Sequence, residues 1–309
     1  MEITYISWII FNVFVITMLV IDLTIFHRDP HAISPREAYI ASTFWIALGL
    51  LFGVGIHYFI GSEAAASYFA GYLLEKSLSI DNLFVFLMIF SYFCVPKAYL
   101  HTVLFWGVLG ALVMRAIFIF SGVALIEKFH WITYILGLFL IITGIKLMRE
   151  KGEKIHPEKN LALRFFNLFL RMTPTYVNGH FFVKKDNRYW ATPLFAVLVV
   201  VETTDVIFAI DSVPAILAIT KDPFIVYTSN VFAILGLRSL YFALESSMGL
   251  FQYLNYGLAS LLIFIGVKMM IAGYVTIPVV WVLVVIAVVL SISIGASIIY
   301  KTDPPKPPA

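Results

Sequence analysis

The sequence predicts an all-α protein, a polytopic transmembrane helix bundle of about nine helices that forms one domain over residues 1–309. Of the 309 residues, 61% are hydrophobic and only 13% are charged, whereas a soluble domain is about a quarter charged. The mean hydropathy is +0.95. The apolar residues also gather in runs of about 20 or more, which is the length that crosses the hydrocarbon core of a bilayer.

The apolar runs define the expected helices in order along the chain. The first run follows Glu2 in place of a basic segment and is longer than the core of a signal peptide, so we interpret it as a retained helix. The expected helices cover about residues 5–26, 38–60, 66–92, 99–126, 130–149, 193–220, 223–245, 251–272 and 277–300.

Two groups of three runs resemble each other. The stretch "SLSIDNLFVF" around Asp81 aligns with "VIFAIDSVPAI" around Asp211, "GALVMRAIF" aligns with "FAILGLRSLYF", and "YILGLFLIITGIKLM" aligns with "YGLASLLIFIGVKMM". Three matches in the same order indicate an internal repeat. Because each unit has three crossings, helices three to five and helices six to eight form an inverted repeat, an arrangement typical of transporters. The two repeats cover about residues 66–149 and 193–272.

The segment between the repeats, about residues 150–192, is basic and is expected to be a cytoplasmic loop. Its stretch "NLALRFFNLFLRM" combines a Phe- and Leu-rich face with Arg164 and Arg171, which predicts an interfacial helix over residues 160–172. Attraction to anionic membrane lipid explains the lysines around it, so no nucleic acid is expected as a partner.

The distribution of loop lysines and arginines also predicts the orientation. On the side opposite the basic segment, the loops hold only Lys128 and Lys221. The positive-inside rule therefore places the N-terminus outside and the C-terminus in the cytoplasm. The proline-rich tail, residues 301–309, is expected to be disordered.

Acidic side chains lie deep within the expected helices. Each costs about 2.5 to 3.5 kcal/mol at the centre of a spanning helix, so a proton, a basic side chain or a bound cation must compensate. On a straight helix, Glu202 and Asp205 lie about 60° apart, but Asp205 and Asp211 lie about 120° apart. Pro214 removes a backbone donor beside Asp211, so we expect a helix break there that lets the acids converge.

The acids, two further polar side chains and freed backbone carbonyls would form a cage of oxygen ligands. Such a cage suits a hard or borderline divalent cation such as Mn²⁺, Mg²⁺ or Ca²⁺, and surplus carboxylates could couple its movement to protons. Cys94 is the only cysteine, which excludes an intramolecular disulfide and any cysteine cluster for soft metals. The predicted metal ligands are Glu75, Asp81, Asn82, Glu202, Asp205, Asp211 and Ser212.

Three basic residues within the helices are candidates for counter-charge or gating. Arg115 and Arg238 align in the repeat, where a structural ion pair with the acids is the alternative role. Lys76 directly follows Glu75 in sequence, although adjacent helical residues point about 100° apart. Lys268 lies near a helix end and is expected to reach the membrane interface.

The motifs "SLSIDNLFVF", "ATPLFAVLVVVETTDVIFAIDSVPAILAIT" and "FIVYTSNVFAILGLRSLYFAL" resemble the TerC family of bacterial membrane proteins, in particular its Alx-like members. The resemblance extends from about Tyr72 to Met270. It implies manganese export across the bacterial cytoplasmic (inner) membrane. The family's acidic positions fall on Glu75, Asp81, Glu202, Asp205 and Asp211, and all five are carboxylates here.

Three functions are compatible with these patterns. The first is a transporter that expels Mn²⁺ or a similar divalent cation, which would be its substrate and not a resident cofactor. The second is an accessory factor that docks on secretion or membrane-insertion machinery and supplies metal to exported proteins. The third is an intramembrane aspartyl enzyme, in which two carboxyls share a proton. The number of acids and their duplication favour an ion site over a catalytic dyad, so no enzymatic activity is expected.

Overall fold

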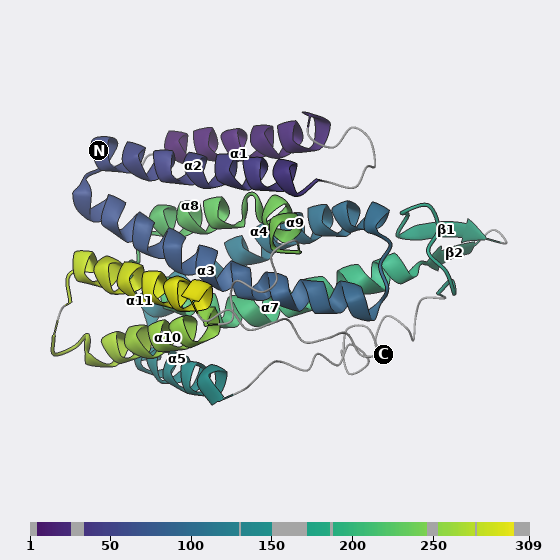
Figure 1. Cartoon of the computed structure of the whole chain (residues 1–309). Helices are drawn as coiled ribbons and strands as arrows, with labels where there is room; N and C mark the ends of the chain where they lie inside the picture. Colours follow the sequence, from purple (N-terminus) through teal and green to yellow (C-terminus); the bar gives the residue numbers. More distant parts are fainter. Residues whose placement is uncertain are drawn as a thin grey trace.

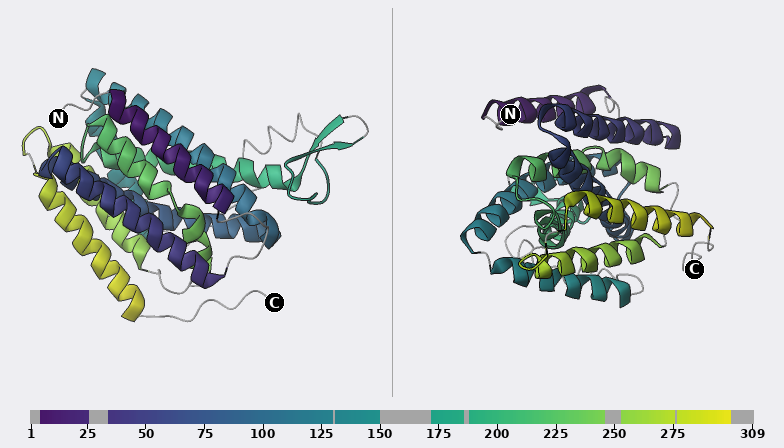
Figure 2. Two further views of the ribbon diagram at one scale, coloured as in Figure 1. Left: turned by 90° about the horizontal axis from the view of Figure 1, so that it is seen from above. Right: turned by 90° about the vertical axis from the view of Figure 1, so that its left-hand side faces the viewer.

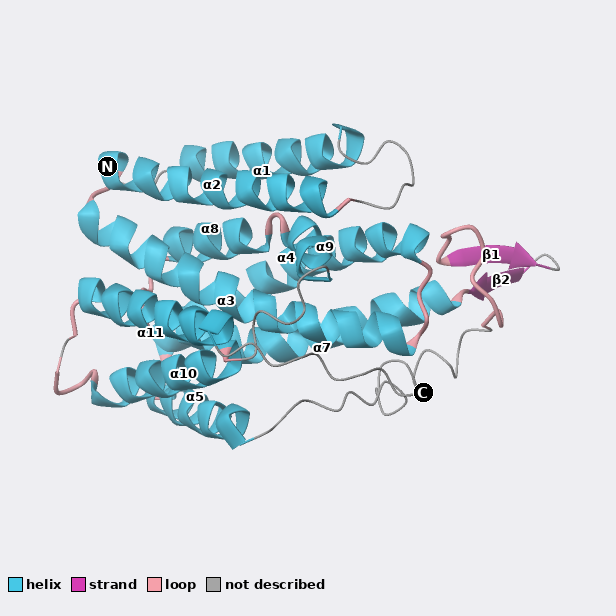
Figure 3. Ribbon diagram, viewed as in Figure 1, coloured by secondary structure: helices cyan, strands magenta, loops and turns pink. Residues whose placement is uncertain are grey.

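The structure, a computed structural model, describes residues 5–25, 34–129, 131–149, 172–185, 188–245, 253–275 and 277–299. The helices in the described residues are α1 (Tyr5–Ile25), α2 (Pro35–Phe59), α3 (Ser62–Tyr92), α4 (Lys97–Lys128), α5 (Ile132–Arg149), α7 (Pro193–Leu217), α8 (Pro223–Ile234), α9 (Leu237–Glu245), α10 (Leu254–Ile271) and α11 (Val279–Ile299). The strands are β1 (Phe182–Lys185) and β2 (Arg188–Ala191). Figure 3 shows that helices make up nearly all of the described chain.

The expected helices are present, and the all-α membrane bundle is confirmed in outline. Six described segments are long and apolar enough to cross a membrane, when α8 and α9 are taken together. Two shorter apolar helices cover Tyr5–Ile21 and Tyr256–Ile271. Many large apolar side chains on the outer helices are exposed, which is the surface expected of a protein that faces lipid.

The expected helix break at Pro214 is wrong, because α7 continues through this residue to Leu217. Only one backbone donor is lost there, and α7 packs against both α3 and α4, which support the helix. The break lies instead in the segment expected as one helix over 223–245. It separates α8 from α9 at Gly236, whose φ of +81° is a left-handed conformation that favours glycine.

Local sequence signals explain where two helices begin. Ser34 accepts a hydrogen bond from the Glu37 amide while Glu37 accepts one from the Ser34 amide, so the two residues form a capping box before α2. Asp222 accepts hydrogen bonds from the amides of Phe224 and Ile225 at the start of α8. A proline follows each cap at the first helical position, where its missing amide is not needed.

The hairpin of β1 and β2 was not expected from the sequence. Its strands are antiparallel, with Phe182 opposite Ala191, and Figure 1 shows it extending beyond one end of the helices. Tyr176 ties the preceding loop to the bundle by donating a hydrogen bond of 2.8 Å to the Phe93 carbonyl. Burial raises the pKa of Tyr176 to about 12, so its hydroxyl remains a neutral donor.

Two predicted segments fall mainly outside the described residues. Of the interfacial helix expected over residues 160–172, only Met172 is described, and it forms a parallel bridge with Ala191. The tail expected to be disordered, residues 301–309, also lies outside the described ranges. Both expectations therefore stay predictions.

The helices form layers around α3, which runs obliquely through the middle of the bundle (Figures 1 and 2). On one side lie α8 and α9, with α1 and α2 beyond them, and on the other lie α5, α10 and α11. Within this arrangement α3 and α4 each pack against both α7 and α8. These four helices therefore enclose the interior where the acidic residues lie.

Helices α5 and α10 approach each other very closely. A Cβ added to Gly266 would lie 2.6 Å from the Gly137 carbonyl oxygen, and one added to Gly144 would lie 2.7 Å from the Ala259 carbonyl oxygen. Small residues are thus required on both sides of this crossing, as is common between helices in membranes.

We expect Gly266→Ala to lower the free energy of unfolding by about 1 to 3 kcal/mol, because the added methyl group would push the two backbones apart. Denaturation of the purified protein in detergent measures this effect. Gly55→Ala in α2 is the matched control, since a Cβ there meets nothing within 4 Å. The control should be as stable as the wild type or slightly more stable, and equal stabilities of the two variants would contradict the prediction.

Candidate functional site

Polar side chains from four helices meet inside the apolar bundle. Glu75 comes from α3, Arg115 from α4, Asp205 from α7 and Asn230 from α8. Each of these four side chains is buried, with residue exposures between 1% and 7%. They meet because α3 and α4 both pack against α7 and α8.

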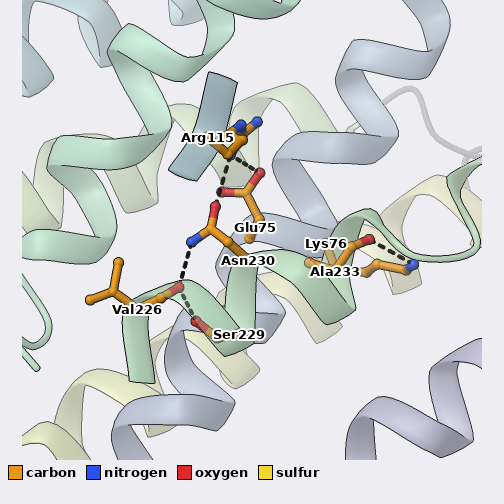
Figure 4. A network of polar contacts seen from close by, with 7 residues as sticks. All are labelled: Glu75, Lys76, Arg115, Val226, Ser229, Asn230 and Ala233. Atoms are coloured by element: carbon orange, nitrogen blue, oxygen red, sulfur yellow. Dashed lines mark hydrogen bonds and ion pairs between the residues drawn. The ribbon is translucent and has the colours of Figure 1, made fainter. Parts of the chain in front are cut away.

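Glu75 and Arg115 form a buried ion pair at the centre of this group. The Arg115 Nη1 donates to Glu75 Oε1 and also to Asn230 Oδ1, the latter at 3.0 Å (Figure 4). The amide of Asn230 in turn donates to the Val226 carbonyl at 3.0 Å, which fixes the orientation of the amide. Arg115 of α4 and Glu75 of α3 therefore form an ion pair between two helices, while the predicted role of Arg115 in counter-charge or gating stays a prediction.

Asp205 lies next to this ion pair on α7. It is close enough to interact electrostatically with Arg115, Glu75 and Glu202. Within the described part of the chain, its Oδ2 atom is buried and has no hydrogen-bond partner. A buried acceptor without a partner is costly, so this oxygen is available to a proton or a cation.

Glu202 lies three residues before Asp205, on the same face of α7, and is only partly buried. Its carboxylate lies so close to Gly110 of α4 that a Cβ at this glycine would overlap it. The absence of a side chain at Gly110 thus makes room for the Glu202 carboxylate.

The structure describes only some of the remaining predicted metal ligands. Asp81 lies on α3 and Asp211 on α7, but their side chains are outside the described part of the structure. Asn82 and Ser212, the residues that follow them, are buried at 7% and 2% exposure. The Ser212 hydroxyl has no hydrogen-bond partner among the described residues.

The described acids do not by themselves form a metal cage. Among the side chains that the structure describes, no three of His, Cys, Asp or Glu are close enough together to hold a metal ion. Glu75 is held by Arg115, and the set lacks Asp81 and Asp211. Convergence of all five carboxylates on one cation therefore stays a prediction.

Lys76 faces away from the acids. Its Nζ donates to the carbonyls of Ala233 and Leu235, at 3.0 and 3.5 Å, at the end of α8. These carbonyls are exposed by the break at Gly236, and a positive charge is favourable at the C-terminus of a helix. Lys76 therefore neutralises the helix end, and no hydrogen bond or ion pair joins it to an acid whose side chain the structure describes, so its predicted role as a counter-charge stays a prediction.

The other two basic residues lie at the ends of helices. Arg238 is buried at 4% exposure near the start of α9, directly after the break. Lys268 donates to the Ala218 carbonyl at 2.6 Å, so it caps the C-terminal end of α7. This bond adds a specific partner to the expectation that Lys268 reaches a membrane interface.

Sequence reasoning missed three residues that shape this site: Asn230, Gly110 and Gly236. Asn230 is a polar residue within the apolar run of α8, the same signal that identified the acids. Gly110 precedes Arg115 in the repeat motif, and Gly236 precedes Arg238 in the matching one. Both glycines lay within the aligned motifs, but only coordinates show what each of them approaches.

Comparison with known proteins gives the family. The family model described as "Integral membrane protein TerC family" matches residues 60–304. The chain is 47% identical over 298 residues to the "Uncharacterized membrane protein STKORF319" of Myxococcus xanthus, with 96% of this chain and 93% of the relative covered. It is 46% identical over 311 residues to the "Putative membrane-bound redox modulator Alx" of Escherichia coli strain K12, with 97% of each covered. No solved structure matches. The chain belongs to the TerC family of integral membrane proteins.

Proposed function

We propose that this protein exports a divalent cation, Mn²⁺ first among them, from the cytoplasm through the acidic centre of the bundle. One observation carries the proposal: carboxylates from α3 and α7 lie buried beside Arg115, and Asp205 Oδ2 has no partner among the described residues. Ionisable groups at this depth are expensive to bury and typically mark an ion pathway. Oxygen ligands favour a hard or borderline divalent cation, and the family resemblance favours manganese.

An inverted repeat would explain why the acids meet between the two halves of the chain. In the sequence alignment, Gly137 matches Ala259 and Gly144 matches Gly266. The close approaches are Gly137 with Gly266 and Gly144 with Ala259, which is the reciprocal pairing that a two-fold axis produces. The helix contacts are reciprocal as well, because α3 packs on α8 as α7 packs on α4. A substrate site at the interface of such repeats is typical of secondary transporters.

Protons are the proposed coupling ion. When the cation leaves, the acids that are not neutralised by Arg115 would need protons to remain buried. We place the protein in the bacterial cytoplasmic membrane with its N-terminus outside and its C-terminus inside, on the basis of the loop lysines and arginines. In this orientation the β1 and β2 hairpin lies on the cytoplasmic side.

The two alternative functions would each need a different structural feature. An accessory factor of secretion or membrane insertion would need a docking surface, for which the basic segment around residues 150–192 is the candidate. An intramembrane aspartyl enzyme would need two carboxyls that share a proton. The redox role in the name of the Alx relatives, if transferred here, could not use an intramolecular disulfide, because the chain has a single cysteine.

Asp205→Asn tests the proposed function in cells challenged with MnCl₂. We expect cellular manganese, measured by mass spectrometry, to rise to the level of cells without the protein, because the variant removes a buried charge from the cation path. Asp81→Asn and Asp211→Asn should behave alike.

Glu63→Gln is the matched control, since Glu63 lies exposed in the first turn of α3, on the same helix as Glu75. It should maintain the manganese level of the wild type. Unchanged manganese in Asp205→Asn, together with an accumulating unprocessed membrane protein, would support the enzyme and contradict export.

A further inference from the structure

Arg115 places a positive charge within the acidic centre. Its side chain is 2% exposed, that of Glu75 is 1% exposed, and the two form the ion pair shown in Figure 4. Asn230 accepts a second hydrogen bond from the same Nη1 atom at 3.0 Å. A guanidinium held between a carboxylate and an amide oxygen occupies a position in which a metal ion would find two oxygen ligands.

Arg115 and its neighbour Asp205 each have a polar atom without a hydrogen-bond partner among the described residues. The Arg115 Nε atom is buried without such a partner, and Asp205 Oδ2 is in the same state. Asp205 also interacts electrostatically with the guanidinium. A guanidinium released from Glu75 would therefore remain in a negative field, so it would not be left as an isolated buried charge.

Lys76, a second buried cation, is not bonded to Glu75 in this structure. Lys76 follows Glu75 in sequence, but its Nζ bonds the Ala233 and Leu235 carbonyls at the end of α8. The two residues thus connect α3 to its neighbours in different directions. Arg115 therefore contacts a predicted metal ligand directly, through its ion pair with Glu75.

We propose that Arg115 is a tethered competitor of the transported cation for the Glu75 carboxylate. With no cation bound, the guanidinium neutralises Glu75, so the empty site does not contain an unpaired buried charge there. An arriving divalent cation displaces the guanidinium from Glu75, and the guanidinium returns when the cation leaves. The competition lowers the apparent affinity for the cation, which allows release after transport.

This inference rests on the proposed function, because it assumes that a divalent cation uses Glu75. It differs from a purely structural ion pair in one consequence. Removal of any nearby positive charge relieves repulsion of a cation, so tighter binding by a variant without Arg115 is required by the inference but would also follow from a structural arginine. A variant that keeps both charges and only loosens the guanidinium from Glu75 separates the two roles, because it strengthens cation binding only if Arg115 competes.

The test is Mn²⁺ binding to the full chain in lipid nanodiscs, measured by isothermal titration calorimetry with MnCl₂. We expect Arg115→Gln to bind Mn²⁺ at least about fivefold more tightly than the wild type, within the range of ordinary coupling between two linked ligands. Binding by the wild type with equal or weaker binding by Arg115→Gln would overturn this inference alone. Absence of Mn²⁺ binding by both proteins would overturn the proposed function together with it.

Asn230→Leu keeps the test decisive if Arg115→Gln does not fold. This variant retains both charges but removes the second acceptor that holds the guanidinium on Glu75, so Mn²⁺ affinity should rise by at least about twofold. An unchanged or lower affinity in a folded Asn230→Leu protein would overturn the inference.

Lys268→Gln is the control for the general loss of a positive charge inside the bundle. This lysine caps α7 through the Ala218 carbonyl and makes no bond to the acids in the described structure. Its Mn²⁺ affinity should stay within about twofold of the wild type. A gain equal to that of Arg115→Gln would overturn the specific role of Arg115.

Discussion

Replacement of Gly110 by valine is expected to lower the initial rate of Mn²⁺ export by about tenfold or more, because groups that orient metal ligands commonly contribute that much. A Cβ at this position would overlap the Glu202 carboxylate, so the carboxylate must rotate away or α4 must move. Either response displaces an acid from the proposed path. Efflux of Mn²⁺ from loaded vesicles that contain the variant measures the effect.

Gly107→Ala provides the control on the same helix. A Cβ at Gly107 meets only Val201 Cγ1, at 3.2 Å, so the new methyl group contacts an apolar side chain and no carboxylate. We expect its export rate to stay within about twofold of the wild type. Export at the wild-type rate by a folded Gly110→Val protein would show that the position of Glu202 is unimportant.

The buried ion pair is expected to give the largest effect on stability. Arg115→Leu leaves Glu75 buried without its partner, and Glu75→Leu leaves an arginine that cannot lose its charge. Arg115→Leu should lower the free energy of unfolding by about 3 to 5 kcal/mol, and Glu75→Leu should lower it by less, because Asp205 keeps Arg115 in a negative field. The double variant should lose much less than the sum, because an apolar pair contains no uncompensated charge.

Denaturation of the four proteins in detergent gives this double-mutant cycle. The exposed ion pair of Lys97 and Glu245, with a separation of 3.5 Å and 78% exposure of the Lys97 side chain, is the comparison. Its cycle should show a coupling of less than about 1 kcal/mol. Additive losses at Glu75 and Arg115 would mean that the two side chains do not depend on each other.

The helices were predictable because a membrane-spanning run has a characteristic length of about 20 residues and a characteristic apolar composition. The expected helix over 38–60 corresponds to α2 (Pro35–Phe59), and the expected helix over 99–126 corresponds to α4 (Lys97–Lys128). The hairpin was missed because β1 and β2 are each only 4 residues long, too short for a reliable alternation of apolar and polar residues.

The position of the helix break could not be derived from local rules alone. Pro214 suggested a break, yet α7 accommodates it, since neighbouring helices support the chain around one missing hydrogen bond. The actual break at Gly236 is stabilised by contacts that are distant in sequence. Trp45 packs over the glycine, and Lys76 bonds the carbonyls that the break exposes.

For the candidate site, sequence identified the charged groups but not their partners. Acids within apolar runs stand out by composition, as Glu75 and Asp205 did. The choice of Arg115 as the partner of Glu75 requires α3 and α4 to pack against the same two helices, α7 and α8, and the sequence does not specify this packing. The same reason explains why Asn230 and Gly110 were missed.

The central claim is that acids from the two halves of the chain carry a divalent cation across the membrane. Mn²⁺ flux into liposomes that contain only the purified full chain tests it most directly, with an Mn²⁺-quenched dye inside. We predict saturable flux that depends on the proton gradient and is abolished in Asp205→Asn. Flux equal to that of protein-free liposomes, or equal flux in wild type and Asp205→Asn, would contradict the claim.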